Sequence, residues 1–73
     1  MSGGADRVKA YRIYFVGSDG RLQLGQAFEA PDDQAAGARA EALAAPGQSA
    51  ELWEGGRMVG QVSKLGVYRP GAG

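Results

Sequence analysis

The sequence predicts a small α+β domain, ββαββ in element order, in which a four-stranded, largely antiparallel sheet carries one helix packed on one face. Three observations predict it. Two pairs of segments rich in β-branched and aromatic residues each flank a turn that contains glycine. A single alanine-rich segment with helical spacing of its apolar residues lies between the two pairs. A chain of 73 residues is too short for two domains.

The first predicted hairpin joins a strand over residues 10–16 to a strand over residues 21–29. Gly17-Ser18-Asp19-Gly20 supplies the turn, because Gly20 can adopt a positive φ. Pairing Val16 with Arg21 gathers one set of apolar side chains on the face expected to contact the helix: Tyr11, Ile13, Phe15, Leu22, Leu24 and Phe28. The other face then carries Arg12, Tyr14, Val16, Arg21, Gln23, Gly25 and Glu29. A one-residue slip would mix the two faces, so their segregation favours this register.

The predicted helix begins at Pro31-Asp32-Asp33 and ends near Ala45, before Pro46-Gly47. Either Asp32 caps it, or Pro31 sits in its first turn with both carboxylates near the positive end of the helix. Its expected buried stripe consists of Ala36, Ala40 and Leu43.

The second predicted hairpin pairs residues 49–54 with residues 57–63 around Gly55-Gly56, a two-residue turn expected to need two positive φ angles. In this register Glu54 lies opposite Arg57, on the same face as Ala50, Leu52 and Val59. The other face carries Ser49, Glu51, Trp53, Met58, Gly60 and Val62. Two strand orders, 2-1-3-4 and 2-1-4-3, are both compatible with a right-handed crossover after the second strand.

The domain is expected to span residues 10–63. Residues 1–9 combine small residues with mixed charge and show no apolar periodicity, so we expect a disordered N-terminal tail. Residues 64–73 are expected to form a C-terminal tail that is partly or wholly disordered.

Composition argues against most enzymatic chemistry. The chain has no histidine and no cysteine, so the commonest general base, the thiolate nucleophile and the usual ligands of zinc, haem and iron–sulfur centres are missing. Asp32-Asp33 is the one adjacent carboxylate pair, and we interpret it as helix-start chemistry in preference to a metal site. We therefore expect no enzymatic activity, no cofactor and no metal. The absence of an apolar leader or a long apolar run favours a cytoplasmic protein without membrane contact.

Two surfaces are candidates for binding. The first is an apolar patch on the side of the sheet that the helix leaves uncovered, expected to make the chain a homo-oligomer or to bind an unknown protein partner: Trp53, Met58, Val62, Tyr14 and Val16. Self-association through the edge strands of the sheet is the other route left open. Trp53 is assigned to this side because the opposite choice would bury Ser49 and Glu51 without evident partners. The alternative is that Trp53 forms the core of the second hairpin.

The second candidate would make the chain a small nucleic-acid-binding or regulatory protein. It is a nucleic-acid platform on the open face of the first hairpin: Arg12, Tyr14 and Arg21, with Gln23 nearby. On an open sheet, aromatic side chains can stack on the bases of single-stranded RNA, and basic side chains can neutralise its phosphates. Eight basic residues are, however, balanced by eight acidic ones. This balance favours an ordinary solvated face, and nucleic-acid binding is the less favoured interpretation.

The run YRIYF, followed by DGRL, FEA, DD, an alanine-rich helix and ELWEGGRMV, resembles a group of small uncharacterised proteobacterial proteins. The resemblance covers Tyr11 to Val62. It implies the strand–strand–helix–strand–strand order and carries no catalytic or binding residues, since no activity is assigned to that group.

Overall fold

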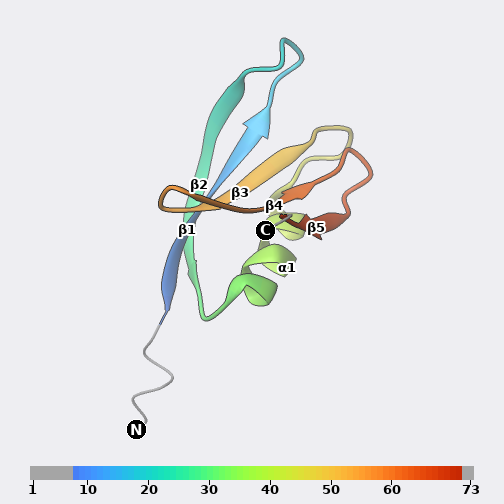
Figure 1. Ribbon diagram of the computed structural model, residues 1–73. Helices are drawn as coiled ribbons and strands as arrows, with labels where there is room; N and C mark the ends of the chain where they lie inside the picture. The colour runs from blue at the N-terminus through green and yellow to red at the C-terminus, as the bar shows by residue number, and fades with distance from the viewer. Residues whose placement is uncertain (1–7, 72–73) are drawn as a thin grey trace, which may run out of the picture.

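The computed structural model describes residues 8–71 and shows an α+β fold. Its elements are β1 (Lys9–Val16), β2 (Leu22–Ala30), α1 (Asp33–Leu43), β3 (Ala50–Glu54), β4 (Arg57–Val62) and β5 (Tyr68–Pro70). The strands form one sheet in the order β2-β1-β3-β4-β5, and every neighbouring pair is antiparallel (Figure 1). The α+β class and the ββαββ order are confirmed, with the first of the two proposed strand orders. The prediction of four strands is wrong, because a fifth follows them.

Helix α1 begins where the sequence predicts. Asp32 is the N-cap, and its carboxylate accepts a hydrogen bond of 2.8 Å from the backbone N–H of Ala35. Of the two alternatives for the start, the cap at Asp32 is therefore the one observed. Ala36 and Ala40 are fully buried, as predicted, and Leu43 packs partly buried against the core. These small side chains let the helix lie close to the sheet.

The predicted register of the first hairpin is wrong by one residue. Val16 pairs with Leu22 and Tyr14 with Leu24, so both leucines lie on the face opposite the helix. The register then shifts again between Arg12 and Tyr14, where Gly25 and Gln26 form a β-bulge opposite Ile13. Gly25 is required there, since a Cβ would meet the Ile13 carbonyl oxygen at 2.6 Å and the Phe15 ring at 2.7 Å.

The register of the second hairpin also differs from the prediction, because strand β4 contains a bulge. Trp53 pairs with Met58 as predicted, but Leu52 pairs with Gly60, which leaves Val59 as the extra residue. The residues that follow change faces, so Val62 pairs with Ala50 and is buried in the core at 1% exposure. The turn also differs from the prediction, because Gly55 has a positive φ and Gly56 does not.

Strand β5 lies within residues 64–73, the C-terminal tail expected to be partly or wholly disordered. It pairs with β4, and the Tyr68 ring fills the space between α1 and the sheet. A Cβ on Gly37 would meet the Tyr68 Cε2 atom at 2.5 Å, and one on Gly60 would meet the Tyr68 hydroxyl at 2.5 Å. The absence of side chains at these two glycines therefore makes the slot for the ring. The N-terminal boundary is close to the prediction, since β1 begins at Lys9; the predicted tails at residues 1–7 and 72–73 lie outside the described residues.

The core lies between α1 and one face of the sheet. Its buried members are Tyr11, Ile13, Ala30, Ala36, Ala40, Ala50, Leu52, Val59 and Val62. Within residues 8–71, we find no helix with the length and apolar character needed to cross a bilayer.

Candidate interaction surface

The face of the sheet opposite α1 carries an aromatic pair at its centre. Leu52 points into the core at 0% exposure, so strand alternation directs its neighbour Trp53 to the other side. There the indole meets the Tyr14 ring edge-on, with centroids 6.4 Å apart and ring planes at 90°. The Trp53 Nε1 donates a hydrogen bond of 3.0 Å to Glu51. The polar atom of the indole is thereby satisfied while much of its apolar surface stays at the face.

Four more apolar side chains extend this pair. Met58 lies opposite Trp53 in β4, while Leu24 and Leu22 lie opposite Tyr14 and Val16 in β2. We call the whole set the open-face cluster: Tyr14, Val16, Leu22, Leu24, Trp53 and Met58. Leu24 is 70% exposed and Leu22 is 47% exposed. Figure 1 shows the reason, since the tip of the β1–β2 hairpin projects away from the end of the sheet that α1 covers.

The open-face cluster differs from the predicted partner surface in two ways. Val62 drops out, because the bulge at Val59 turns it into the core. Leu22 and Leu24 enter, because the observed register turns them out of the core. Tyr14, Val16, Trp53 and Met58 are members of both sets.

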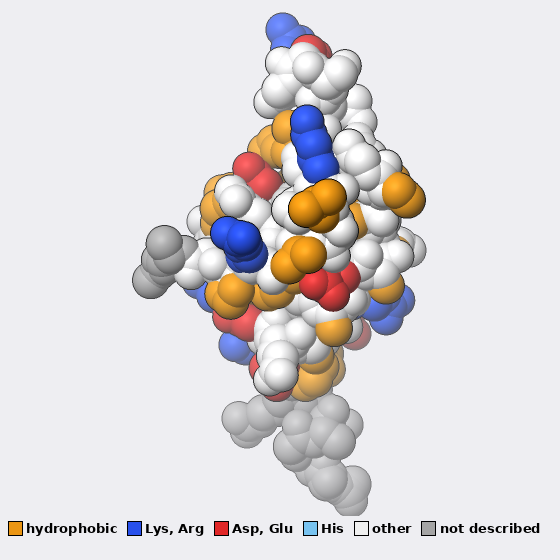
Figure 2. Space-filling model, turned by 90° about the vertical axis from the view of Figure 1, so that its right-hand side faces the viewer, with side chains coloured by type: hydrophobic (Ala, Val, Ile, Leu, Met, Phe, Trp, Pro, Cys, Tyr) orange, Lys and Arg blue, Asp and Glu red, His pale blue; other side chains and the backbone are white. Residues whose placement is uncertain are grey.

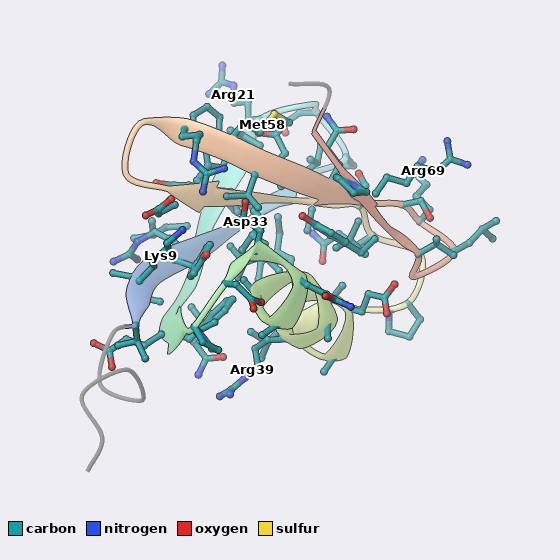
Figure 3. The ribbon with its side chains drawn as sticks, turned by 60° about the horizontal axis from the view of Figure 1, so that its bottom comes forward. Lys9, Arg21, Asp33, Arg39, Met58 and Arg69 are labelled. Atoms are coloured by element: carbon teal, nitrogen blue, oxygen red, sulfur yellow. The ribbon has the colours of Figure 1, made fainter. Side chains whose placement is uncertain are left out.

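The residues of the predicted nucleic-acid platform do not form a basic patch. Arg12 donates from Nη1 to the carbonyl oxygen of Gly25 at 3.4 Å, which occupies its guanidinium at the bulge. Arg21 lies at the hairpin turn, 3.9 Å from Asp19, and Tyr14 is packed against Trp53. In Figure 3, the side chains of Arg21, Arg39 and Arg69 point away from the molecule in different directions. Figure 2 likewise shows basic and acidic side chains interspersed with hydrophobic ones over one side of the molecule.

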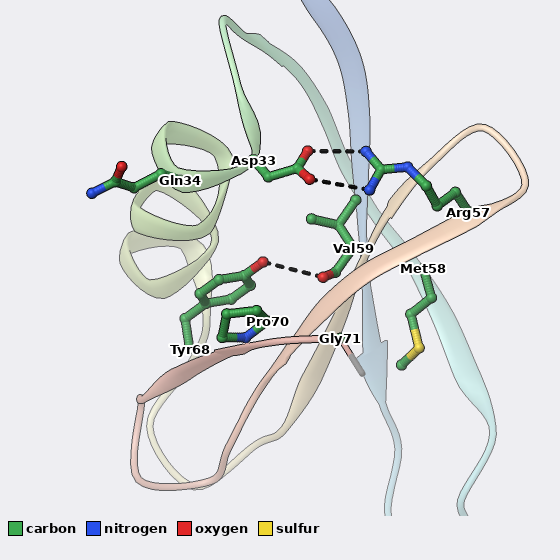
Figure 4. Close-up of a pocket in the computed structure, with 8 residues that line it drawn as sticks. All are labelled: Asp33, Gln34, Arg57, Met58, Val59, Tyr68, Pro70 and Gly71. Carbon is green, nitrogen blue, oxygen red and sulfur yellow. Dashed lines mark hydrogen bonds and ion pairs between the residues drawn. The ribbon is translucent and has the colours of Figure 1, made fainter. Parts of the chain in front are cut away.

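The side of the sheet that faces α1 carries a charged network near the start of the helix (Figure 4). Arg57 donates two hydrogen bonds to the Asp33 carboxylate, at 3.0 and 2.9 Å, and also pairs with Glu54. The buried Tyr11 hydroxyl donates to Asp33 at 2.8 Å. Hydrogen bonds from Arg57 and Tyr11 lower the pKa of Asp33 from 3.8 to about 2. Burial, together with the bond to Asp33, raises the pKa of Tyr11.

A half-open cavity of about 730 Å³ borders this network, between the start of α1 and strands β4 and β5. Its two ionised side chains, Asp33 and Arg57, neutralise each other across a bidentate contact. An anion or a cation entering the cavity would have to displace one of them. The network is therefore suited to fixing α1 on the sheet, and it offers no free acid or base.

Two further polar side chains, Ser63 and Glu41, hold the backbone around β5. The Ser63 hydroxyl accepts hydrogen bonds of 3.3 Å from the backbone N–H groups of Leu65 and Val67, which organise the β4–β5 turn. Glu41 accepts from the backbone N–H of Tyr68 at 2.6 Å and so ties α1 to β5. Among residues 8–71, no three acidic side chains are grouped so as to hold a metal ion.

Comparisons of the chain with family models, with curated proteins and with solved structures gave no match. The resemblance to small proteobacterial proteins therefore stays a prediction.

Sequence reasoning missed Leu22 and Leu24 as surface residues, and it missed the role of Asp33. A signal for the leucines was present, since an isolated glycine inside a strand pattern, here Gly25, is typical of a bulge. The contact between Asp33 and Arg57 spans 24 residues and had no local signal.

Proposed function

We propose that the chain is a small cytoplasmic interaction module without enzymatic activity, and that it self-associates by packing the open-face cluster against a second copy. The observation that carries the proposal is the exposure of Leu24 and Leu22 beside the Tyr14–Trp53 pair on an uncovered sheet face. Large contiguous apolar patches are rare on monomers and mark interaction surfaces. Tryptophan, tyrosine and methionine are also enriched at such surfaces.

Burial of the open-face cluster against a second copy would supply the driving force for association. Burial of one exposed leucine side chain contributes about 1.5–3 kcal/mol. Two copies would bring together four leucines and two tryptophans from the open-face cluster. This gross gain has to exceed the loss of translational, rotational and side-chain freedom, about 4–15 kcal/mol, before it gives affinity. Size also favours such support, because a domain of this length buries a smaller fraction of its surface than a larger domain does, and the chain has no cysteine to form a disulfide.

Light scattering coupled to size-exclusion chromatography tests the proposal. Wild-type protein at micromolar concentration is expected to have the mass of two or more chains, in place of the 7.5 kDa of one. Trp53→Glu should lower that mass while the circular dichroism spectrum stays that of a folded chain, because the core on the α1 side is untouched. Leu65→Glu is the matched control, since Leu65 is 90% exposed in the β4–β5 turn, outside the open-face cluster.

Three outcomes would contradict the proposal. A wild-type mass near 7.5 kDa at high concentration would remove self-association. An unchanged oligomer for Trp53→Glu would place the contact elsewhere. An unfolded Trp53→Glu chain would show that the indole belongs to the core.

A further inference from the structure

The two edges of the sheet differ in how well they are protected against pairing. The β5 edge is three residues long, contains Arg69 and Pro70, and leads into Gly71, whose N–H donates to the Val59 carbonyl. The β2 edge is nine residues long, and Glu29 is its one charged residue. Natural sheets usually protect exposed edges with lysine, proline, very short strands or a β-bulge. The sequence of β2 contains neither lysine nor proline, and its one feature of this kind is the bulge at Gly25 and Gln26.

The unpaired backbone groups of β2 can be assigned from the pairing of β1. The N–H of Val16 donates to the Ser49 carbonyl at 2.9 Å, so it points toward the β3 side of β1. Alternation along β1 turns the N–H groups of Tyr14, Arg12 and Ala10 the same way. Their partners in β2 are therefore in non-hydrogen-bonded pairs, with N–H and C=O directed to the free edge: Leu22, Leu24, Ala27 and Glu29.

The bulge gives this edge an unusual spacing. Outward-facing residues of a regular strand recur every second position. In β2, the bulge at Gly25 and Gln26 separates Leu24 and Ala27, so these two residues, whose backbone N–H and C=O groups point to the free edge, are three positions apart. A partner strand without a bulge can form hydrogen bonds with the edge-directed N–H and C=O groups on one side of the bulge, but not with those on both sides. A strand with the same interruption is needed, and an antiparallel second copy of β2 has it.

We propose that β2 pairs antiparallel with β2 of a second copy, about a two-fold axis between Gly25 and Gln26. In this register Leu24 lies opposite Ala27 of the second copy, and Leu22 lies opposite its Glu29. All four pairs use outward-facing backbone groups, and each pair can exchange two hydrogen bonds. Such a contact is closed by its own symmetry, so it ends at two chains.

Side chains support the same register. The four paired residues all have their side chains on the open face, so the leucines of both copies lie on one continuous face of the joined sheet.

This inference rests on the proposed function only in requiring that the chain binds itself. Together, the edge contact and the open-face contact give an assembly of four chains with two different interfaces. Each interface can then be disrupted by its own variant. Trp53→Glu should leave a two-chain species held by β2, and a variant blocked at the β2 edge should leave a two-chain species held by the open face.

Ala27→Pro is the edge variant, because it removes an outward-facing N–H while leaving the open-face cluster intact. Ala27→Ser is its control, since it keeps that N–H. We expect Ala27→Pro to halve the mass measured by light scattering, and Ala27→Ser to leave it unchanged. An unchanged mass for a folded Ala27→Pro chain would overturn the edge contact.

Cysteine cross-linking gives a second measurement that does not depend on the folding of the proline variant. The chain has no cysteine, so a single introduced thiol reports one position. Gln26→Cys places thiols beside the two-fold axis and should oxidise rapidly to a disulfide-linked pair, while Arg69→Cys on the opposite edge should not. Equal rates for the two variants would overturn the β2 pairing. If the Trp53→Glu variant still had a lower mass than the wild type in that case, the proposed open-face contact would stand without the β2 pairing.

Discussion

Replacing Gly37 by alanine tests the packing of Tyr68 between α1 and the sheet. In an isolated helix this change is favourable by about 1 kcal/mol, because glycine is a poor helix former. In this protein the new Cβ would lie 2.5, 2.6 and 2.9 Å from three atoms of the Tyr68 ring. The ring cannot retreat, since its hydroxyl lies against Gly60 and donates to the Val59 carbonyl at 3.3 Å.

Overpacking a well-filled site typically costs about 1–3 kcal/mol, and contact with three ring atoms favours the upper end. Subtracting the gain in helix propensity, we expect Gly37→Ala to lower the free energy of unfolding by about 2 kcal/mol. In a Tyr68→Ala background the obstacle is gone. There the same change should raise the free energy of unfolding by up to about 1 kcal/mol, for a coupling of about 3 kcal/mol between the two sites.

Urea denaturation followed by far-ultraviolet circular dichroism measures all four proteins of this cycle, at one protein concentration because assembly contributes to stability. Ala38→Gly at the neighbouring exposed helix position is the control, with an expected loss of about 1 kcal/mol in both backgrounds. The reasoning depends on the change of sign. If Gly37→Ala stabilised the chain that retains Tyr68, the ring would not occupy this slot.

Two further predictions concern charge. Because the pKa of Asp33 is lowered from 3.8 to about 2, its ionised form stabilises the folded state above about pH 4, and this contribution is lost as the pH falls from 3.8 toward 2. Asp33→Asn should therefore be less stable than wild type at neutral pH and similar to it near pH 2 in urea titrations; a constant difference across that range would contradict the assignment. We also expect no nucleic-acid binding at physiological salt, because eight basic and eight acidic residues are spread over the chain and few counterions would be released. Fluorescence anisotropy with labelled single- and double-stranded oligonucleotides checks this, and micromolar binding that weakens steeply with salt would favour the platform of Arg12, Tyr14 and Arg21 instead.

Local sequence patterns predicted the fold class and the order of the first five elements. They did not predict the registers of the two hairpins or the last strand, β5. Turn residues and a capping aspartate are signals within a few positions, and they located the hairpins and α1 correctly. The register of the first hairpin failed at its turn, where Val16 pairs with Leu22 and not with Arg21, and it shifted again at the Gly25 bulge. The register of the second hairpin failed at the bulge next to Gly60. The burial of Val62 and the exposure of Leu24 are direct results of these shifts.

Strand β5 escaped prediction for a different reason. Its three residues carry too little periodicity to identify a strand, and one of them is proline. What holds it is the fit of Tyr68 to Gly37 and Gly60 and a hydrogen bond to Glu41, all of which are distant contacts. A pattern confined to the segment itself has no information about a slot formed by two glycines elsewhere in the chain.

The glycine-lined slot for Tyr68 also restricts the order in which substitutions can accumulate in descendants of this chain. A lineage that first replaces Gly37 or Gly60 meets the aromatic ring and loses stability at once. A lineage that first loses Tyr68 gives up the contact between β5 and α1, after which a larger residue at position 37 can restore lost packing. Position 60 stays closed to larger residues, because the backbone carbonyl of Arg69 also lies against it. Exchange of Gly37 and Tyr68 therefore has a preferred direction, beginning at residue 68, and related chains should retain or lose these two residues together.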